Sequence, residues 1–99
     1  MSYKCISLDE AQPLLDNPDT VIVDIRDRGS YEEGNIPGSI NISDENIDNF
    51  LEKTERDINL LVYCYVGNSS KGASDYFVQQ GFKTVFSLDG GYEKFAGKR

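Results

Sequence analysis

Cys64 stands where an apolar segment, residues 59–64, gives way to a loop of small and polar residues, and it is the first candidate for a nucleophile. The stretch VYCYVGNSSKGAS covers residues 62–74, and the chain contains no histidine. A histidine base therefore cannot activate this thiol. Backbone N–H groups and a helix N-terminus can do so instead, because they stabilise a thiolate and lower its pKa from the ordinary ~8.5.

The residues after Cys64 are suited to forming a cradle of hydrogen-bond donors. Gly67 permits a positive φ, and Asn68 with Ser69 or Ser70 can cap a following helix. Successive N–H groups in such a loop form an anion-binding concavity, and the helix dipole adds to it. The pattern indicates a thiolate that attacks an anionic electrophile directly. The structural alternative, a cysteine that is a small buried hydrophobe, is also compatible with this spacing.

The second cysteine, Cys5, is expected to pack near the first strand. The chain has two cysteines, no CxxC pair and no histidine. These are too few ligands for a zinc site, so neither a metal nor another cofactor is expected. In a reducing cytosol both thiols are expected to be free.

The composition indicates one small acidic domain over residues 1–99. The chain has a formal net charge of −7, which disfavours nucleic acid and anionic membranes as partners. It lacks an apolar run of the roughly 20 residues needed to span a bilayer, and its first residues lack the apolar region of a signal peptide. We expect a cytoplasmic monomer.

Short β-rich runs alternate with helical patterns along the chain. VIVDI, rich in β-branched residues, is the clearest buried strand, and Ser7 with Glu10 has the spacing of a capping box that begins a helix. Pro13 is expected to kink or split that helix. Expected strands cover residues 4–6, 21–25, the end of 35–42 after a Pro37-Gly38 turn, 59–64 and 83–88; expected helices cover 8–16, 28–34, 44–53, 69 or 70 to 80 before Gly81, and 92–96.

This alternation favours an α/β domain with a mainly parallel sheet covered by helices on both faces. Ligands of such sheets bind beyond the carboxyl ends of the strands. Cys64 lies at such an end, which is a functional indication independent of its loop.

Four blocks of the sequence, in order, resemble the rhodanese family of sulfurtransferases, in particular its short single-domain thiosulfate sulfurtransferases of the GlpE type. The blocks are VIVDIRD (21–27), YEEGNIPGSINI (31–42), YCYVGNSSKGAS (63–74) and GFKTVFSLDGGYEKF (81–95). The resemblance implies a single rhodanese-like domain with five mainly parallel strands. It places Cys64 at the catalytic position and implies that the loop binds substrate through Tyr65, Val66, Gly67, Asn68, Ser69 and Ser70.

The activity that this resemblance implies is transfer of sulfane sulfur from thiosulfate, through a persulfide on Cys64, to a nucleophilic acceptor. The acceptor would be cyanide in an assay or a dithiol such as thioredoxin in a cell. Four positions depart from the family pattern, and they leave the preferred sulfur donor open: Asn35 replaces the usual His, Val66 a polar residue, Ser69 a basic residue and Phe95 a Trp.

Two other functions remain open. One is a non-catalytic persulfide carrier or binding module. The other is a cysteine phosphatase, which needs an arginine six positions after the cysteine, where this chain has Ser70.

Residues near the expected site also have expected roles. Asp24 and Arg26 are expected to form a salt bridge or anchor a loop rather than contact substrate, and Gly90 with Gly91 to form a tight turn. Tyr65 and Val66 are expected to form an apolar rim. Lys71 fits equally well as a partner of a sulfonate group or as a solvated lysine.

Overall fold

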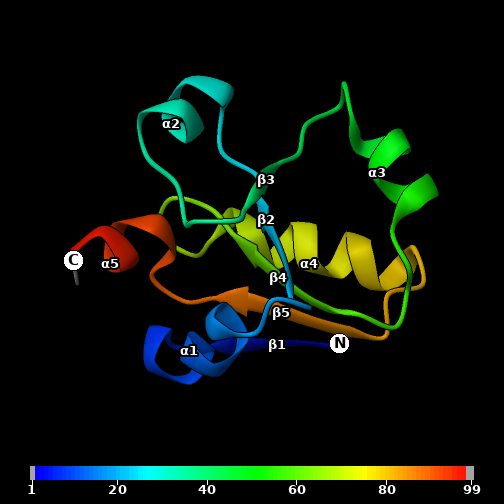
Figure 1. Cartoon of the computed structure of the whole chain (residues 1–99), viewed down its shortest axis with the longest axis horizontal. Coiled ribbons are helices and arrows are strands. Elements are labelled where there is room, and N and C mark those ends of the chain that lie inside the picture. Colours follow the sequence, from blue (N-terminus) through cyan, green and yellow to red (C-terminus); the bar gives the residue numbers. More distant parts are fainter. Residues whose placement is uncertain (1, 98–99) are drawn as a thin grey trace.

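The computed structural model describes residues 2–97 and shows one five-stranded sheet in the order β1-β5-β4-β2-β3 (Figure 1). All four strand pairs are parallel, in agreement with the expected α/β class. The strands are β1 (Tyr3–Ile6), β2 (Val21–Asp24), β3 (Ile40–Asn41), β4 (Asn59–Tyr63) and β5 (Thr84–Leu88); the helices are α1 (Leu8–Asp16), α2 (Arg28–Glu33), α3 (Ile47–Lys53), α4 (Ser69–Gln79) and α5 (Gly91–Gly97).

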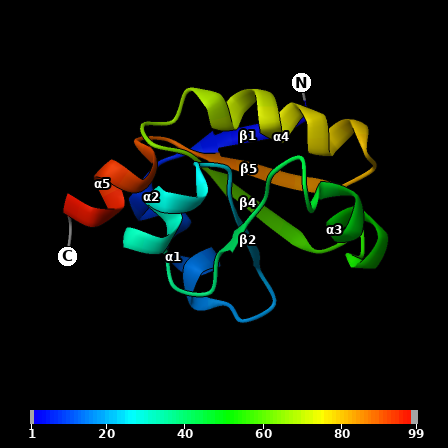
Figure 2. The ribbon, with the colours of Figure 1, turned by 90° about the horizontal axis from the view of Figure 1, so that it is seen from above.

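Strand β4 lies in the middle of the sheet and divides its side chains between two cores. Leu60 and Val62 face one way, toward Phe50 of α3 and Phe77 of α4. Leu61 and Tyr63 face the other way, into a second cluster with residues of α1. Figure 2 shows α4 and α1 on opposite sides of the sheet. This alternation, which follows from the two-residue period of a strand, confirms the expectation of helices on both faces.

Local sequence patterns predicted the boundaries of most helices and strands to within a few residues. The capping box is present, with Ser7 accepting from the Glu10 N–H and the Glu10 carboxylate accepting from the Ser7 N–H. Helix α1 runs unbroken through Pro13, so of the two expected effects, a kink or a split, the split does not occur. Proline has no backbone N–H, so the helix loses one i→i−4 hydrogen bond there.

Helix α3 begins at Ile47, three residues later than expected. The Asn46 side chain accepts from the Ser43 N–H at 2.8 Å and donates to the Asn41 carbonyl at 2.9 Å. These two bonds hold residues 43–46 in a turn after β3. A side chain that bonds to nearby backbone groups in this way competes with helix formation.

Parallel register brings the functional segments to one edge of the sheet. Asp24 pairs with Tyr63, and Val62 pairs with Ser87, so the carboxyl ends of β2, β4 and β5 lie side by side. Cys64 immediately follows β4 at this edge. The predicted position of the cysteine beyond the carboxyl ends of the strands is therefore confirmed.

Cys5 lies on β1 but is exposed, so the expectation that it packs near the first strand is wrong. Both cysteines are free thiols, and Cys5 is exposed whereas Cys64 is buried. Strand order is the reason: among residues 2–97, β1 lies at the edge of the sheet and has β5 on one side alone. Within residues 2–97, none of the helices has the length and apolar character that crossing a membrane requires.

Candidate functional site

The Cys64 sulfur lies in a cradle of backbone donors formed by the loop that follows β4. It accepts from the Gly67 N–H at 3.2 Å and from the Ser70 N–H at 3.3 Å. The residue is only 3% exposed. Gly67 has φ +100, a backbone conformation that favours glycine, and this lets the loop turn back toward the sulfur. The cradle expected from the sequence is therefore present around this thiol.

The cradle determines the ionisation of Cys64. Burial of the sulfur by itself raises the pKa of the Cys64 thiol. Hydrogen bonding by the hydroxyl and N–H of Ser70, and then by the N–H groups of Gly67 and Val66, outweighs burial, so that the net pKa lies below the ordinary value. The donors thus favour the thiolate more than in an ordinary cysteine, and they do so without any histidine.

Helix α4 begins without the side-chain cap that the sequence suggested. Asn68 occupies the N-cap position, but its backbone is helical and its side chain makes no capping hydrogen bond. The Cys64 sulfur instead accepts from Ser70, the second residue of the helix. A capping oxygen normally accepts from the second or third N–H of a helix. The sulfur takes that place, so the charge of a thiolate there would lie at the positive end of α4.

A second segment, the turn from β5 into α5, holds the carbonyl groups of the same loop. The Tyr92 N–H donates to the Cys64 carbonyl at 2.8 Å, and the Glu93 N–H donates to the Tyr65 carbonyl at 3.0 Å. Gly91 has φ +55, and a Cβ there would lie 2.5 Å from the Cys64 carbonyl oxygen. The tight turn expected at Gly90 and Gly91 is confirmed. Its contact with the loop was not predictable from the Gly-Gly pair alone.

Asp24, the last residue of β2, and Arg26, two residues later, stabilise the structure beside the site. Their side chains form a buried salt bridge of 2.8 Å. The Arg26 guanidinium also donates to the Gly34 carbonyl at 2.6 Å and lies 4.2 Å from the centroid of the Tyr92 ring. These contacts tie β2 to the segment after α2 and to α5. The expected structural role of the pair is confirmed.

The six loop residues expected to bind substrate divide into a buried floor and an exposed rim. The floor consists of Gly67 and Ser70, and the rim consists of Tyr65, Val66, Asn68 and Ser69. Tyr65 and Val66 are each 47% exposed, as expected for an apolar rim. Lys71, in the first turn of α4, is also exposed.

The Tyr65 side chain connects the loop to the start of α2. Its hydroxyl donates to the Asp27 carboxylate and lies 3.1 Å from the Ser30 hydroxyl. The Tyr65 hydroxyl and then Ser30 hold the pKa of Asp27 at about 2, so this carboxylate stays charged at neutral pH. Nothing in the sequence linked Tyr65 with Asp27, because the two residues are far apart along the chain.

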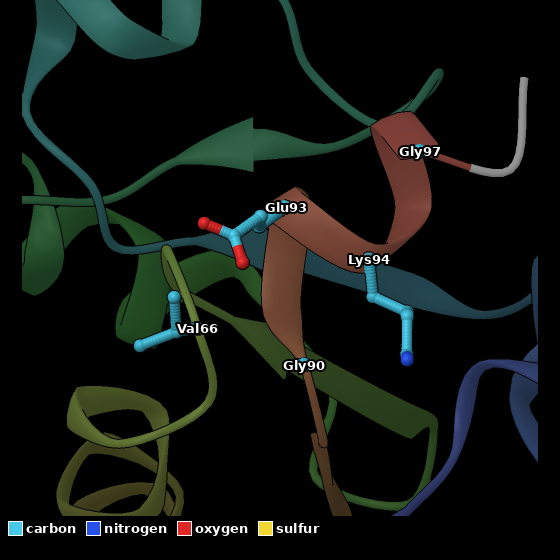
Figure 3. A pocket seen from close by; sticks show the side chains of 5 residues that line it. All are labelled: Val66, Gly90, Glu93, Lys94 and Gly97. Atoms are coloured by element: carbon cyan, nitrogen blue, oxygen red, sulfur yellow. The ribbon is translucent and has the colours of Figure 1, made fainter.

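A hollow of about 430 Å³ lies beside the loop, between the rim and α5. Figure 3 shows the Val66 side chain extending from the loop, and the Glu93 and Lys94 side chains extending from α5. Gly90 and Gly97 complete the lining. The hollow carries both signs of charge and adjoins the rim of the cysteine cradle. Among residues 2–97, no group of His, Cys, Asp and Glu side chains gathers in a way that could hold a metal ion.

The depressed pKa leads to a direct prediction for the reactivity of Cys64. In a Cys5→Ser variant, only Cys64 reacts with iodoacetamide, and the rate rises with the fraction of thiolate. We expect the inflection of rate against pH below the ordinary ~8.5, with the rate falling as the pH drops through it. An inflection at or above the ordinary value would mean that the cradle does not stabilise the resting thiolate.

Comparison with known proteins shows which family this chain resembles over most of its length. The model of the rhodanese-like domain family matches residues 7–98. The chain is 48% identical over 92 residues to the thiosulfate sulfurtransferase GlpE of Pseudoalteromonas translucida, a match that covers 93% of this chain and 88% of that protein.

Solved structures share the fold. A rhodanese-related protein from Thermoplasma volcanium superimposes with a TM-score of 0.79 at 25% identity, covering 97% of this chain and 93% of that one. A rhodanese-like domain protein from Staphylococcus aureus gives 0.76 at 26% identity, covering 91% and 88%. The human single-domain sulfurtransferase TSTD1 gives 0.81 at 22% identity, covering 96% of each chain.

Proposed function

The chain belongs to the rhodanese-like domain family, and from that membership we propose that it is a thiosulfate sulfurtransferase that carries sulfur as a persulfide on Cys64. The observation that carries this proposal is the position of the Cys64 sulfur, buried at a strand end and hydrogen-bonded by the N–H groups of Gly67 in the loop and Ser70 in the first turn of α4. The named relative supports thiosulfate as the donor.

The first step is attack of the Cys64 thiolate on the outer sulfur of thiosulfate. A bond forms between the cysteine sulfur and that outer sulfur, while the sulfur–sulfur bond of thiosulfate breaks. Its electron pair leaves with sulfite, which thereby carries two negative charges, and the terminal sulfur of the persulfide keeps the negative charge that it had in thiosulfate. No proton moves, so the step needs no acid or base. This explains how a chain without histidine could perform it.

The second step returns the enzyme to its starting state. A nucleophile attacks the terminal sulfur of the persulfide, and the electron pair of the broken bond returns to Cys64 as thiolate. With cyanide the product is thiocyanate. With a dithiol such as thioredoxin, the first thiol takes the sulfur and the second releases it as hydrosulfide by forming a disulfide. Two steps through a covalent intermediate are typical of nucleophilic catalysis.

The loop would stabilise most strongly the negatively charged states of the reaction, the Cys64 thiolate and the persulfide. N–H groups that surround the cysteine sulfur can also donate to a second sulfur bonded to it, in the way that an oxyanion hole holds developing charge. Tyr65, Val66, Asn68 and Ser69 lie at the rim, where an incoming donor would pass. We propose that the acceptor approaches over Tyr65 and Val66 and the adjacent hollow. Free thiols at Cys5 and Cys64 suit a reducing compartment such as the cytoplasm.

The decisive experiment is a steady-state assay with thiosulfate and cyanide. We expect many equivalents of thiocyanate per protein, because each transfer regenerates the thiolate. A persulfide carrier that must be loaded by a partner would give at most one equivalent. That outcome would replace the enzyme proposal with the carrier alternative.

The same preparation separates sulfur transfer from phosphatase chemistry. Phosphoryl transfer spreads charge over three oxygens and needs matched donors around them. The bidentate fork of an arginine meets that need, and Ser70 stands at its position here. We expect no appreciable hydrolysis of an aryl phosphate. Robust, Cys64-dependent phosphate release with no reaction of thiosulfate would mean that the chain is a phosphatase.

A further inference from the structure

Two buried hydroxyl groups lie behind the Cys64 sulfur. Ser70, in the first turn of α4, and Ser87, on β5, are both 0% exposed. Their oxygen atoms are 2.8 Å apart. The Ser70 N–H donates to the Cys64 sulfur, and the Ser70 hydroxyl also acts on the same thiol. The two serines therefore form a short chain of hydroxyls beside the nucleophile.

The number of hydrogens limits what this chain can do. Each hydroxyl has one hydrogen to donate, and a single hydrogen lies between the two oxygens. If Ser70 supplies it, Ser70 has none left for the sulfur. If Ser87 supplies it, the Ser70 hydrogen is free to point at Cys64. Only the second arrangement serves a negatively charged sulfur.

We propose that Ser87 is a positioning residue that donates to the Ser70 oxygen and thereby directs the Ser70 hydrogen to the Cys64 thiolate. The inference rests on the proposed function in that Cys64 is the nucleophile. Ser87 itself acts only through Ser70. Because linked hydrogen bonds polarise one another, the bond to sulfur is strengthened by roughly 10–30% over that of an isolated hydroxyl.

Ser74 provides a matched control within the same helix. It lies one turn further along α4, is also 0% exposed, and its hydroxyl has no hydrogen-bond partner among the described residues. Ser74→Ala therefore removes a buried hydroxyl of the same kind without touching the Ser70–Ser87 chain. Any general effect of losing a buried serine would appear in this variant too.

The test is the pH profile of Cys64 alkylation in the Cys5→Ser background. Ser70→Ala should raise the inflection by about one unit, as expected for a lost hydrogen bond to a charged group. Ser87→Ala should raise it by a few tenths of a unit, and Ser74→Ala should leave it unchanged. In the double variant, Ser87→Ala should add nothing to Ser70→Ala, because Ser87 acts through Ser70.

The sign of the Ser87→Ala shift decides the proposal. If Ser87 were instead the acceptor, its removal would free the Ser70 hydrogen and lower the inflection. A lowered or unchanged inflection, or an equal shift in both backgrounds, overturns the proposal. If Ser87→Ala does not fold, Ser87→Cys takes its place, because a thiol is a weaker donor, with alkylation read at the Cys64 peptide by mass spectrometry. Alkylation needs no sulfur donor. A failure of this inference can therefore be distinguished from a failure of the protein to turn over thiosulfate.

Discussion

A Cys64→Ser variant will form no thiocyanate from thiosulfate and cyanide above background, a loss of at least ~10³-fold in kcat. A serine hydroxyl stays protonated at neutral pH, and it cannot form the persulfide that links the two steps. The fold should survive, because serine is close to cysteine in size. Far-UV circular dichroism checks the fold, and mass spectrometry after incubation with thiosulfate checks for the added sulfur atom.

The matched control for this prediction is Cys5→Ser. Cys5 is exposed on the edge strand β1, and the cradle donors surround Cys64 instead. Activity should therefore be retained. If the Cys5 variant lost activity while it remained folded, or if sulfur were found on Cys5 and not on Cys64, the assignment of the nucleophile would be wrong.

A Gly91→Ala variant will lose activity by roughly 100-fold or more, because catalysis is that sensitive to a misplacement of about 1 Å. A Cβ at this position would lie 2.5 Å from the Cys64 carbonyl oxygen and 2.7 Å from the Tyr65 carbonyl carbon. Both neighbours are backbone, so the loop itself must move. The positive φ of 55° adds strain of ~1–2 kcal/mol for an alanine. Tyr92 and Glu93 would then no longer hold the loop carbonyls.

Three measurements follow this change: kcat, the alkylation profile of Cys64, and the midpoint of urea unfolding. We expect all three to shift, the alkylation inflection upward. Gly72→Ala is the matched control, since a Cβ there meets nothing within 4 Å and Gly72 lies inside α4. It should keep full activity and gain ~0.5–1 kcal/mol of stability, since alanine favours a helix over glycine. Equal activity in both variants would show that the Gly91 contact does not position the loop.

Much of the fold was accessible from local sequence signals. A capping box located the start of α1, and the β-branched run at residues 21–25 located β2. These signals work because caps, turns and side-chain periodicity act between residues close in the chain. They gave the wrong start for α3, because the Asn46 side chain bonds to nearby backbone groups and holds the preceding residues in a turn.

The candidate nucleophile was also determined by sequence. A cysteine at the end of an apolar strand, followed by a loop with glycine and serines, indicated an anion cradle and a depressed pKa. The structure agrees on both points. The donors that act on Cys64 lie within six residues of it along the chain, so local sequence patterns could indicate them.

Only the tertiary structure decided which distant groups complete the site. The Ser70–Ser87 pair joins α4 to β5, the Tyr92 N–H reaches the Cys64 carbonyl from α5, and the Tyr65 hydroxyl reaches Asp27. Strand order also places Cys5 on an edge strand, where it is exposed. The residues next to Cys5 in the sequence do not indicate that its strand lies at the edge. Each of these contacts depends on how parallel strands align and which helix covers them. That alignment is set by burial of the whole sheet, and no short stretch of sequence encodes it.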